Sequence, residues 1–302
     1  MSLAPRAVIV HRRTEYEELL ARYGTHGQAA FFLSSRGRSI DEVVRRHERT
    51  RQALREVAAA VPLTWRSSRV ERADLDRFLF APEDVVVVVG QDGLVANTAK
   101  YLRGQPVVGI DTDPGRNPGV LVRHRCADTA ALLRAAIAAG SRAEELTMVE
   151  AVADDTQRLL ALNEIYLGSH GHQTARYRLG SDGDNGDNGQ GEAQASSGVL
   201  VGTGTGATGW LRSLWLERGS SAELPSPCEQ RLLWFVREAW PSPATGTTRV
   251  AGELGRGQGL QLTVESDRIV VFGDGMESDA LELTWGQSVR LGIAGTSLHL
   301  VT

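Results

Sequence analysis

The sequence predicts two domains, an α/β domain with an open, mostly parallel sheet and a mostly antiparallel β-sandwich. Val85–Val89 is a run of five valines, which cannot alternate between a buried and an exposed face. Such a strand is typical of a parallel sheet covered by helices on both sides. Strand-like and helix-like segments alternate up to about residue 140, and short strand-like segments separated by Gly, Pro and Ser follow. We therefore predict domains over residues 1–144 and 145–302.

The first half of the α/β domain contains two predicted strands and two predicted helices. Ala7–Val10 is short and apolar, as expected of a strand. Thr14 can cap a helix that extends to Tyr23, because glutamates fill the first turn. Ser39 precedes a longer segment in which apolar residues recur at helical spacing. A second strand is predicted near Leu63–Arg66, and a polar segment connects it to the valine strand.

The second half of this domain continues the alternation of strands and helices. After the valine strand, Leu94–Leu102 is helix-like and Pro106–Ile110 is a short apolar strand. Asp111–Gly115 is an Asp-Pro-Gly turn, whose carboxylates could contact magnesium or simply shape the turn, and we favour the turn. Thr129–Ala139 is rich in alanine and predicts a helix.

The C-terminal domain is predicted from a series of β-like segments. Residues 180–191 are rich in Gly, Asp and Asn, cannot contribute to a core, and predict a mobile loop near 180–197. Asp274-Gly275 fits a hairpin turn between two strands. The other predicted strands are Leu146–Val152, Arg158–Leu167, Ala175–Leu179, Val199–Val201 and several short ones from Leu232 onward.

Composition and charge exclude several classes of protein. The formal net charge is −4 and the pI is about 6.0, so we expect neither a nucleic-acid partner nor a membrane surface. No stretch approaches 18 consecutive apolar residues and no signal-peptide pattern is present, so a cytoplasmic location is expected. Lys100 is the only lysine among 33 basic residues, which excludes the Gly-Lys-Ser/Thr of a Walker A loop. Cys126 and Cys228 form no recognisable disulfide or metal framework.

The segment Gly90-Gln91-Asp92-Gly93 is the first candidate site. It ends the valine strand and precedes a helix-like segment, so its backbone N–H groups are expected at the carboxyl edge of a parallel sheet. Such groups can bind a phosphate, and Asp92 places a carboxylate among them. The alternative is a simple turn that links strand to helix.

The second candidate site lies in the β-rich half and consists of a Gly/Thr loop and an Asn-Glu pair. Gly202–Trp210 contains Gly-x-Gly-x-x-Gly, but it has no following βαβ unit, which argues against a dinucleotide-binding dehydrogenase. Its hydroxyls and N–H groups suit a nucleotide ribose or phosphate. Asn163-Glu164 begins a β-like segment. His170 and His172 have no further metal ligands nearby, so we expect them to face solvent.

Taken together and in this order, these motifs resemble those of the NAD kinases, and most closely the mitochondrial type. Gly90–Gly93 stands where that family has Gly-Gly-Asp-Gly, and Asn163-Glu164 is similar to its Asn-Glu motif. Thr203–Trp210 resembles its Thr-Pro-Thr-Gly-Ser-Thr-Ala-Tyr loop. The similarity extends over nearly the whole chain, thinly over the first 80 residues.

The resemblance implies an NAD kinase-like fold and transfer of the γ-phosphoryl group of ATP, with Mg²⁺, to the 2′-hydroxyl of the adenosine ribose of NAD. Asp92 would be the catalytic base, and Gly90, Gln91 and Gly93 would bind phosphate. It also implies that the protein is a homodimer. The residues implied to bind NAD are Asn163, Glu164, Thr203, Thr205, Gly206, Thr208, Trp210 and Ser213.

Two departures from the family pattern leave alternative functions open. Gln91 replaces the second glycine of the phosphate loop, and Leu94 replaces the usual Thr or Ser. These replacements motivate a catalytically silent nucleotide-binding regulator as one alternative. A kinase for a hydroxyl of another nucleoside, a sugar or a lipid is a second alternative, because other kinases also resemble the Gly-Gly-Asp-Gly loop. The Thr-Gly loop favours NAD.

Overall fold

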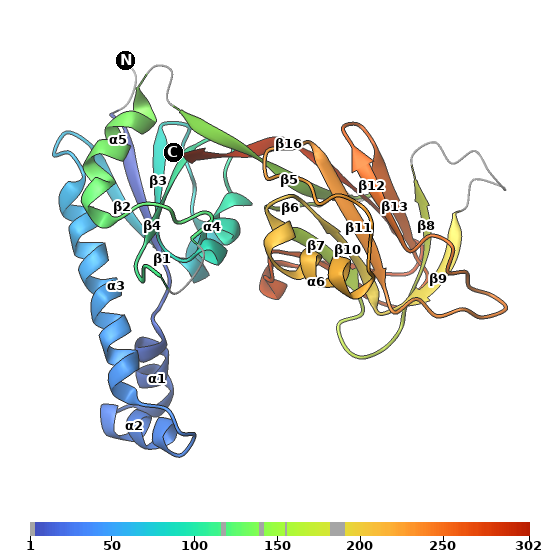
Figure 1. Ribbon diagram of the computed structural model, residues 1–302, viewed down its shortest axis with the longest axis horizontal. Helices are drawn as coiled ribbons and strands as arrows, with labels where there is room; N and C mark the ends of the chain where they lie inside the picture. The colour runs from blue at the N-terminus through green and yellow to red at the C-terminus, as the bar shows by residue number, and fades with distance from the viewer. Residues whose placement is uncertain (1–3, 116–118, 139–141, 155, 182–190) are drawn as a thin grey trace. The chain divides into compact units, whose positions relative to one another are not determined.

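The computed structural model describes residues 4–115, 119–138, 142–154, 156–181 and 191–302 (Figure 1). It consists of an α/β domain with a mixed, mostly parallel sheet and a region of antiparallel sheet. The chain divides into two compact units, which we call unit 1 and unit 2. Unit 1 contains residues up to Glu144 together with His299–Thr302, and unit 2 contains Glu145–Leu298.

Unit 1 is built on four parallel strands in the order β2-β1-β3-β4. Parallel strands end at the same edge of a sheet, so Gly90 at the end of β3 is paired with Asp111 at the end of β4. The last residues of β16, His299 and Leu300, extend this sheet in parallel beside β4. For this reason the C-terminal residues belong to unit 1, although the domain predicted over residues 145–302 includes them. The bounds are β1 (Arg6–His11), β2 (Arg66–Glu71), β3 (Asp84–Gly90), β4 (Pro106–Asp111) and β16 (Ser288–Val301).

Helices cover both faces of the unit 1 sheet (Figure 1). Val85, Val87 and Val89 of β3 pack with α3 (Ile40–Ala60) and α5 (Thr129–Ile137). Val86 and Val88 point to the other face and are equally buried, and α4 (Asp92–Ala99) contacts β3. The prediction that helices cover this strand on both sides is confirmed.

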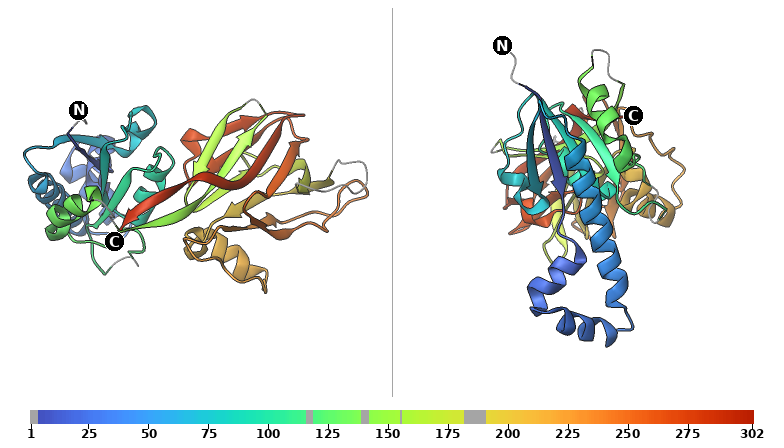
Figure 2. Two further views of the ribbon diagram at one scale, coloured as in Figure 1. Left: turned by 90° about the horizontal axis from the view of Figure 1, so that it is seen from above. Right: turned by 90° about the vertical axis from the view of Figure 1, so that its left-hand side faces the viewer.

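A helical hairpin lies beside the first turns of α3, as Figure 2 shows in its right-hand view. It consists of α1 (Glu15–Tyr23) and α2 (His26–Ser34), and it shares a small apolar core with α3. Thr14 and Ser39 cap α1 and α3 as predicted. Helix α2 was not predicted from the sequence, although Thr25 followed three residues later by Gln28 is a helix-start pattern.

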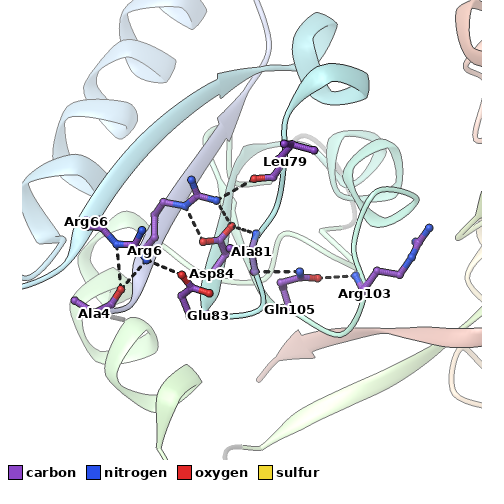
Figure 3. Close-up of polar contacts among 9 residues, drawn as sticks. All are labelled: Ala4, Arg6, Arg66, Leu79, Ala81, Glu83, Asp84, Arg103 and Gln105. Carbon is purple, nitrogen blue, oxygen red and sulfur yellow. Dashed lines mark hydrogen bonds and ion pairs between the residues drawn. The ribbon is translucent and has the colours of Figure 1, made fainter. Parts of the chain in front are cut away.

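The amino end of β3 is anchored by a buried ion pair (Figure 3). Both oxygens of Asp84, which is 1% exposed, accept hydrogen bonds from Arg6, at 2.7 and 2.6 Å. The backbone N–H of Ala81 also donates to Asp84. The hydrogen bond to Asp84 raises the pKa of the Arg6 guanidinium, so Arg6 stays charged. Burial of this carboxylate is possible because each oxygen has a donor.

Unit 2 contains two antiparallel sheets. Strand β16 continues from unit 1 into the order β16-β13-β8-β9, with β5 beside β16 and β6 beside β5. The second sheet has the order β12-β11-β10-β7-β14-β15. The bounds of these strands are β5 (Ala143–Ala153), β6 (Arg158–Ala161), β7 (Glu164–Gly168), β8 (Ala175–Ser181), β9 (Glu192–Ser196), β10 (Gly198–Gly202), β11 (Arg231–Arg237), β12 (Ala251–Gly255), β13 (Gly259–Val264), β14 (Ile269–Gly273) and β15 (Leu281–Leu283).

One apolar core lies between the two sheets of unit 2. Residues from both sheets belong to it, among them Tyr177 of β8 and Trp234 of β11. The other face of the six-stranded sheet is covered by α6 (Trp210–Glu217), which packs through Leu211 and Leu214 (Figure 1). The short 3-10 helices are η1 (Arg72–Arg77), η2 (Cys126–Asp128), η4 (Gly206–Thr208) and η5 (Glu277–Asp279).

Several predicted elements need correction. The strand expected near Leu63–Arg66 is β2, which begins at Arg66 and runs through the segment described as polar. The single segment Arg158–Leu167 is two strands, β6 and β7, interrupted at Leu162 and Asn163. The loop predicted near 180–197 includes β9, which pairs with β8, while residues 182–190 lie outside the described residues.

Candidate functional site

The Gly90–Gly93 segment lies at the carboxyl edge of the unit 1 sheet. Strand β3 ends at Gly90, Gln91 precedes the first residue of α4, and Asp92 is that first residue. Gln91 is extended, with φ −124° and ψ 164°, and its side chain is exposed. Glutamine adopts this conformation without strain, so the replacement of glycine at this position is compatible with the fold.

The carboxylate of Asp92 holds a neighbouring segment of backbone. Asp92 Oδ1 accepts from the N–H groups of Leu121 and Val122, at 2.8 and 2.9 Å, and Oδ2 accepts from Val120 N–H at 3.0 Å. The segment also lies so close to β4 that a Cβ atom on Gly109 would be 2.1 Å from the Leu121 carbonyl oxygen. Asp92 therefore has a structural role that the sequence did not predict.

The glycines of this turn leave space above the backbone. A Cβ atom on Gly93 would meet no atom within 4 Å, and one on Gly90 would meet only the side chain of Leu94, at 3.2 Å. Neither glycine has a positive φ. Contacts within the folded chain therefore do not explain why glycine stands at these two positions. A ligand that approaches the backbone closely would explain it.

Asp111 and Asp113 shape the turn after β4. Asp111 Oδ1 accepts from the Asp113 N–H at 2.8 Å, and Asp113 forms an ion pair with Arg49 at 3.1 Å. Residues 116–118 lie outside the described part of the chain. Among the residues that the structure describes, no three His, Cys, Asp or Glu side chains cluster as metal ligands would.

In unit 2 the backbone of Leu162–Glu164 is held by two side chains. Asp274 accepts from the N–H groups of Leu162 and Asn163, at 2.9 and 2.7 Å. Thr203 donates its hydroxyl to the Leu162 carbonyl at 2.5 Å, and its N–H donates to the Asn163 carbonyl at 2.9 Å. The Asn-Glu pair predicted to begin a strand does so, since β7 starts at Glu164.

The Thr-Gly loop lies directly against this segment. A Cβ atom on Gly206 would be 2.3 Å from the Asn163 carbonyl oxygen, so only glycine fits there. The Thr203 hydroxyl accepts from the N–H groups of Thr205 and Gly206, which shapes the loop. Thr205 is 2% exposed and its buried hydroxyl has no hydrogen-bond partner in the described structure. An unsatisfied buried hydroxyl is costly, and it suits a site that a ligand completes.

Glu164 is a carboxyl group in an unusual environment. Burial, and after it the nearby charge of Asp274, raise the pKa of Glu164 to about 8. Opposite Glu164 in the neighbouring strand stands Gly202, which offers no side chain. Desolvation and a like charge both disfavour the ionised form, so Glu164 can donate a hydrogen bond at neutral pH.

The other predicted residues of this half lie at or near the same loop. Thr208 is exposed and donates its hydroxyl to the Thr205 carbonyl at 2.9 Å. Ser213 is exposed on α6. Trp210 stacks on Tyr166, with ring centroids 5.4 Å apart, and the guanidinium of Arg237 lies 5.5 Å from its ring centroid. Trp210 is thus largely committed to contacts within unit 2.

The structure brings the predicted site residues together in two groups, one in each unit. Two residues of this region were not predicted as site residues: Asp274, which was predicted only to shape a hairpin turn, and Tyr166, whose hydroxyl donates to the Ser197 carbonyl. The signal for Asp274 was present, because it repeats the Asp-Gly that follows β3. A cavity of about 400 Å³ lies elsewhere in unit 2, between residues 169–176 and 265–268, and none of the predicted site residues lines it. His170 is part of that lining and is exposed, as expected.

No protein-family model matches the chain, and no curated protein matches it significantly. In the described part of the chain, no helix combines the length and apolar character needed to cross a membrane.

Proposed function

We propose that this chain is an ATP-dependent NAD kinase with an NAD kinase-like fold. It would transfer the γ-phosphoryl group of ATP to the 2′-hydroxyl of the adenosine ribose of NAD and so form NADP. In this proposal Gly90, Gln91 and Gly93 bind phosphate, and the segments around Asn163 and Thr205 bind the adenosine part of NAD. The family resemblance also leads us to propose a homodimer.

The observation that carries the proposal is the set of polar groups beside the Thr-Gly loop. The buried Thr205 hydroxyl has no partner in the described structure, and burial and the charge of Asp274 raise the pKa of Glu164. A hydroxyl, a carboxyl and the adjacent amide of Asn163 can together donate to and accept from the edge of a base and the hydroxyls of a ribose. The Gly90–Gly93 turn separately supports phosphate binding, because its N–H groups lie at the start of α4.

Asp92 can act as the base even though it holds the Val120–Val122 backbone. A carboxylate has about four lone-pair positions, and three are used by N–H donors, so one remains for the substrate hydroxyl. As the bond from the ribose oxygen to the γ-phosphorus forms and the bond to ADP breaks, this oxygen would take the hydroxyl proton. The backbone contacts would keep the carboxylate in place throughout, which is the main contribution of a protein to phosphoryl transfer.

Magnesium in this proposal enters with ATP. Mg²⁺ is commonly held by substrate phosphates together with one or two carboxylates. Asp111 and Asp113 already have partners, since Asp113 is paired with Arg49 and Asp111 accepts a backbone N–H. They would therefore supply only one or two of the ligands, and the phosphates of ATP would supply others. The ion would neutralise charge on the transferred phosphoryl group.

The decisive experiment incubates the purified chain with ATP, Mg²⁺ and NAD and measures NADP. We expect NADP with the wild-type chain and none with Asp92→Asn, while NAD still raises the melting temperature of the variant. Phosphorylation of another nucleoside, a sugar or a lipid without NADP would move the function to the alternative kinase. If no product forms and NAD does not raise the melting temperature, the proposal is refuted.

A second candidate is a catalytically silent nucleotide-binding regulator. It is favoured by Asp92, whose carboxylate already accepts three backbone N–H groups and therefore has a structural role that needs no catalysis. This candidate predicts that NAD or ATP raises the melting temperature while no phosphoryl transfer to any acceptor is detected.

A further inference from the structure

Asp274 has a backbone conformation that is energetically unfavourable for residues other than glycine. It follows the buried strand β14 with φ +53°, a left-handed conformation that few residues other than glycine adopt. Aspartate tolerates it better than most, but the conformation still costs about 1 kcal/mol. Its own N–H donates to the Glu164 carbonyl at 3.1 Å. This geometry turns the Asp274 carboxylate back toward the start of β7.

The carboxylate is bound to the site segment at the two residues that precede Glu164. The N–H groups of Leu162 and Asn163 donate to different oxygens of Asp274. From the other side, Thr203 binds the carbonyl groups of the same two residues. In the short break between β6 and β7, Asp274 therefore binds the backbone N–H groups and Thr203 binds the backbone carbonyl groups.

We propose that Asp274 is a positioning residue for the ligand site of unit 2: its carboxylate fixes the Leu162–Asn163 backbone and thereby sets where the side chains of Asn163 and Glu164 meet the ligand. The identity of that ligand as NAD rests on the proposed function, but the positioning itself does not.

Asp274 also acts on Glu164 through its charge. Next to Glu164 in the sheet lie Gly202 on β10, which offers no side chain, and Asp274 after β14, whose N–H donates to the Glu164 carbonyl. Among them Asp274 supplies the charge that, after burial, raises the pKa of Glu164. The same residue thus fixes the backbone and favours the neutral, hydrogen-bond-donating form of Glu164.

The test compares Asp274→Asn and Asp274→Gly with Asp154→Asn. Asparagine and glycine both tolerate the left-handed conformation, so these variants remove the charge without forcing the turn to refold. Asp154 is the matched control, because it accepts from the Ser288 N–H at 2.8 Å elsewhere in unit 2. Hydrogen exchange of the Leu162 and Asn163 amides and a carboxyl ¹³C titration of Glu164 need no ligand, whereas the KM for NAD tests the consequence for binding.

For both Asp274 variants we expect lost protection of the two amides. We expect the Glu164 titration midpoint to fall below 8 but stay above 4.5, because burial remains. The KM for NAD should rise roughly tenfold, since hydrogen bonds to a charged acceptor are lost. Asp154→Asn should change neither the exchange of these amides nor the titration, and KM should stay within about twofold.

Unchanged protection and an unchanged Glu164 midpoint in Asp274→Asn would overturn the proposal, whatever the activity. Lower stability of both Asp274 variants with unaltered KM and titration would also overturn it, because that pattern belongs to a purely structural residue. A wild-type chain that does not bind NAD would instead refute the proposed function, and the exchange and titration data would still decide the role of Asp274.

Discussion

Two turns of this molecule use the same chemistry in different surroundings. Asp92 follows β3 in unit 1 and Asp274 follows β14 in unit 2, and glycine comes next in both. Each carboxylate binds backbone N–H groups of a segment distant in sequence, three for Asp92 and two for Asp274. The Asp274 turn also adjoins Glu164, whose pKa is raised, and a loop whose Thr205 hydroxyl is unsatisfied.

In both places, the main role of the Asp-Gly turn after a buried strand is to fix the backbone of another segment of the chain. A carboxylate accepts several hydrogen bonds, and a loop at a strand end has N–H groups that need acceptors. A catalytic role is added when other groups without partners lie nearby. Four sets of variants test this distinction.

The largest effect is expected for the glycine that unit 2 needs for its own fold. Gly206→Ala should lower the free energy of unfolding by about 3 kcal/mol, because its Cβ atom would overlap the Asn163 carbonyl. Gly93→Ala in unit 1 is the matched variant, and with open space around it stability should rise by about 0.5 kcal/mol. Urea unfolding measures both, and equal losses would remove the proposed difference between the two turns.

The next effect concerns the dependence of stability on pH. Because the pKa of Glu164 is raised to about 8, the folded chain keeps a proton that the unfolded chain releases near pH 4.5. The contribution of Glu164 to stability therefore falls as pH rises through this window, at up to about 1.4 kcal/mol per pH unit, and is constant above it. Glu164→Gln should abolish this part of the pH dependence in urea unfolding from pH 5 to 9. An identical slope in wild type and variant would show that Glu164 ionises normally.

Asp92 should contribute measurably to stability in addition to any catalytic role. Asp92→Ala leaves the N–H groups of Val120, Leu121 and Val122 without their acceptor and should cost about 2 kcal/mol. Asp92→Asn keeps one acceptor oxygen, so its loss should be about half as large. Thermal unfolding and hydrogen exchange of the three amides provide the measurement. If Asp92→Ala is as stable as wild type, Asp92 is not a backbone anchor and the parallel with Asp274 fails.

Only a small effect on stability is expected at Gln91. Its extended backbone is accessible to any residue, so Gln91→Gly should cost only about 0.5 to 1 kcal/mol through greater freedom of the unfolded chain. Its effect on NADP formation is more informative. An increase would mean that the side chain obstructs the phosphate, and a decrease would mean that its amide donates to a phosphate oxygen.

Much of the fold could be predicted where burial and capping are local properties of the sequence. The valine run gave a strand buried on both faces, and Thr14 and Ser39 cap the helices that they were expected to begin. Strand β9 could not be predicted, because Glu192–Ser196 alternates only alanine with polar residues, and two of its polar residues, Gln194 and Ser196, are the ones most deeply buried. Its Gln194 is buried only because the Arg249 carbonyl, Glu192 and Tyr177 supply hydrogen bonds. Strand β2 was misplaced because a polar edge strand has the composition of a loop.

Residue types and their order along the chain are enough to find the groups that could form a site: a carboxylate in a glycine turn, an Asn-Glu pair and a Thr-Gly loop. How these groups are used depends on the folded chain. It brought Asp274 to the backbone of a segment 112 residues earlier in the chain and placed Val120–Val122 on Asp92. It also buried Glu164 beside a like charge. The physical reason is that hydrogen bonding and desolvation depend on neighbours in space, which spacing along the chain does not specify.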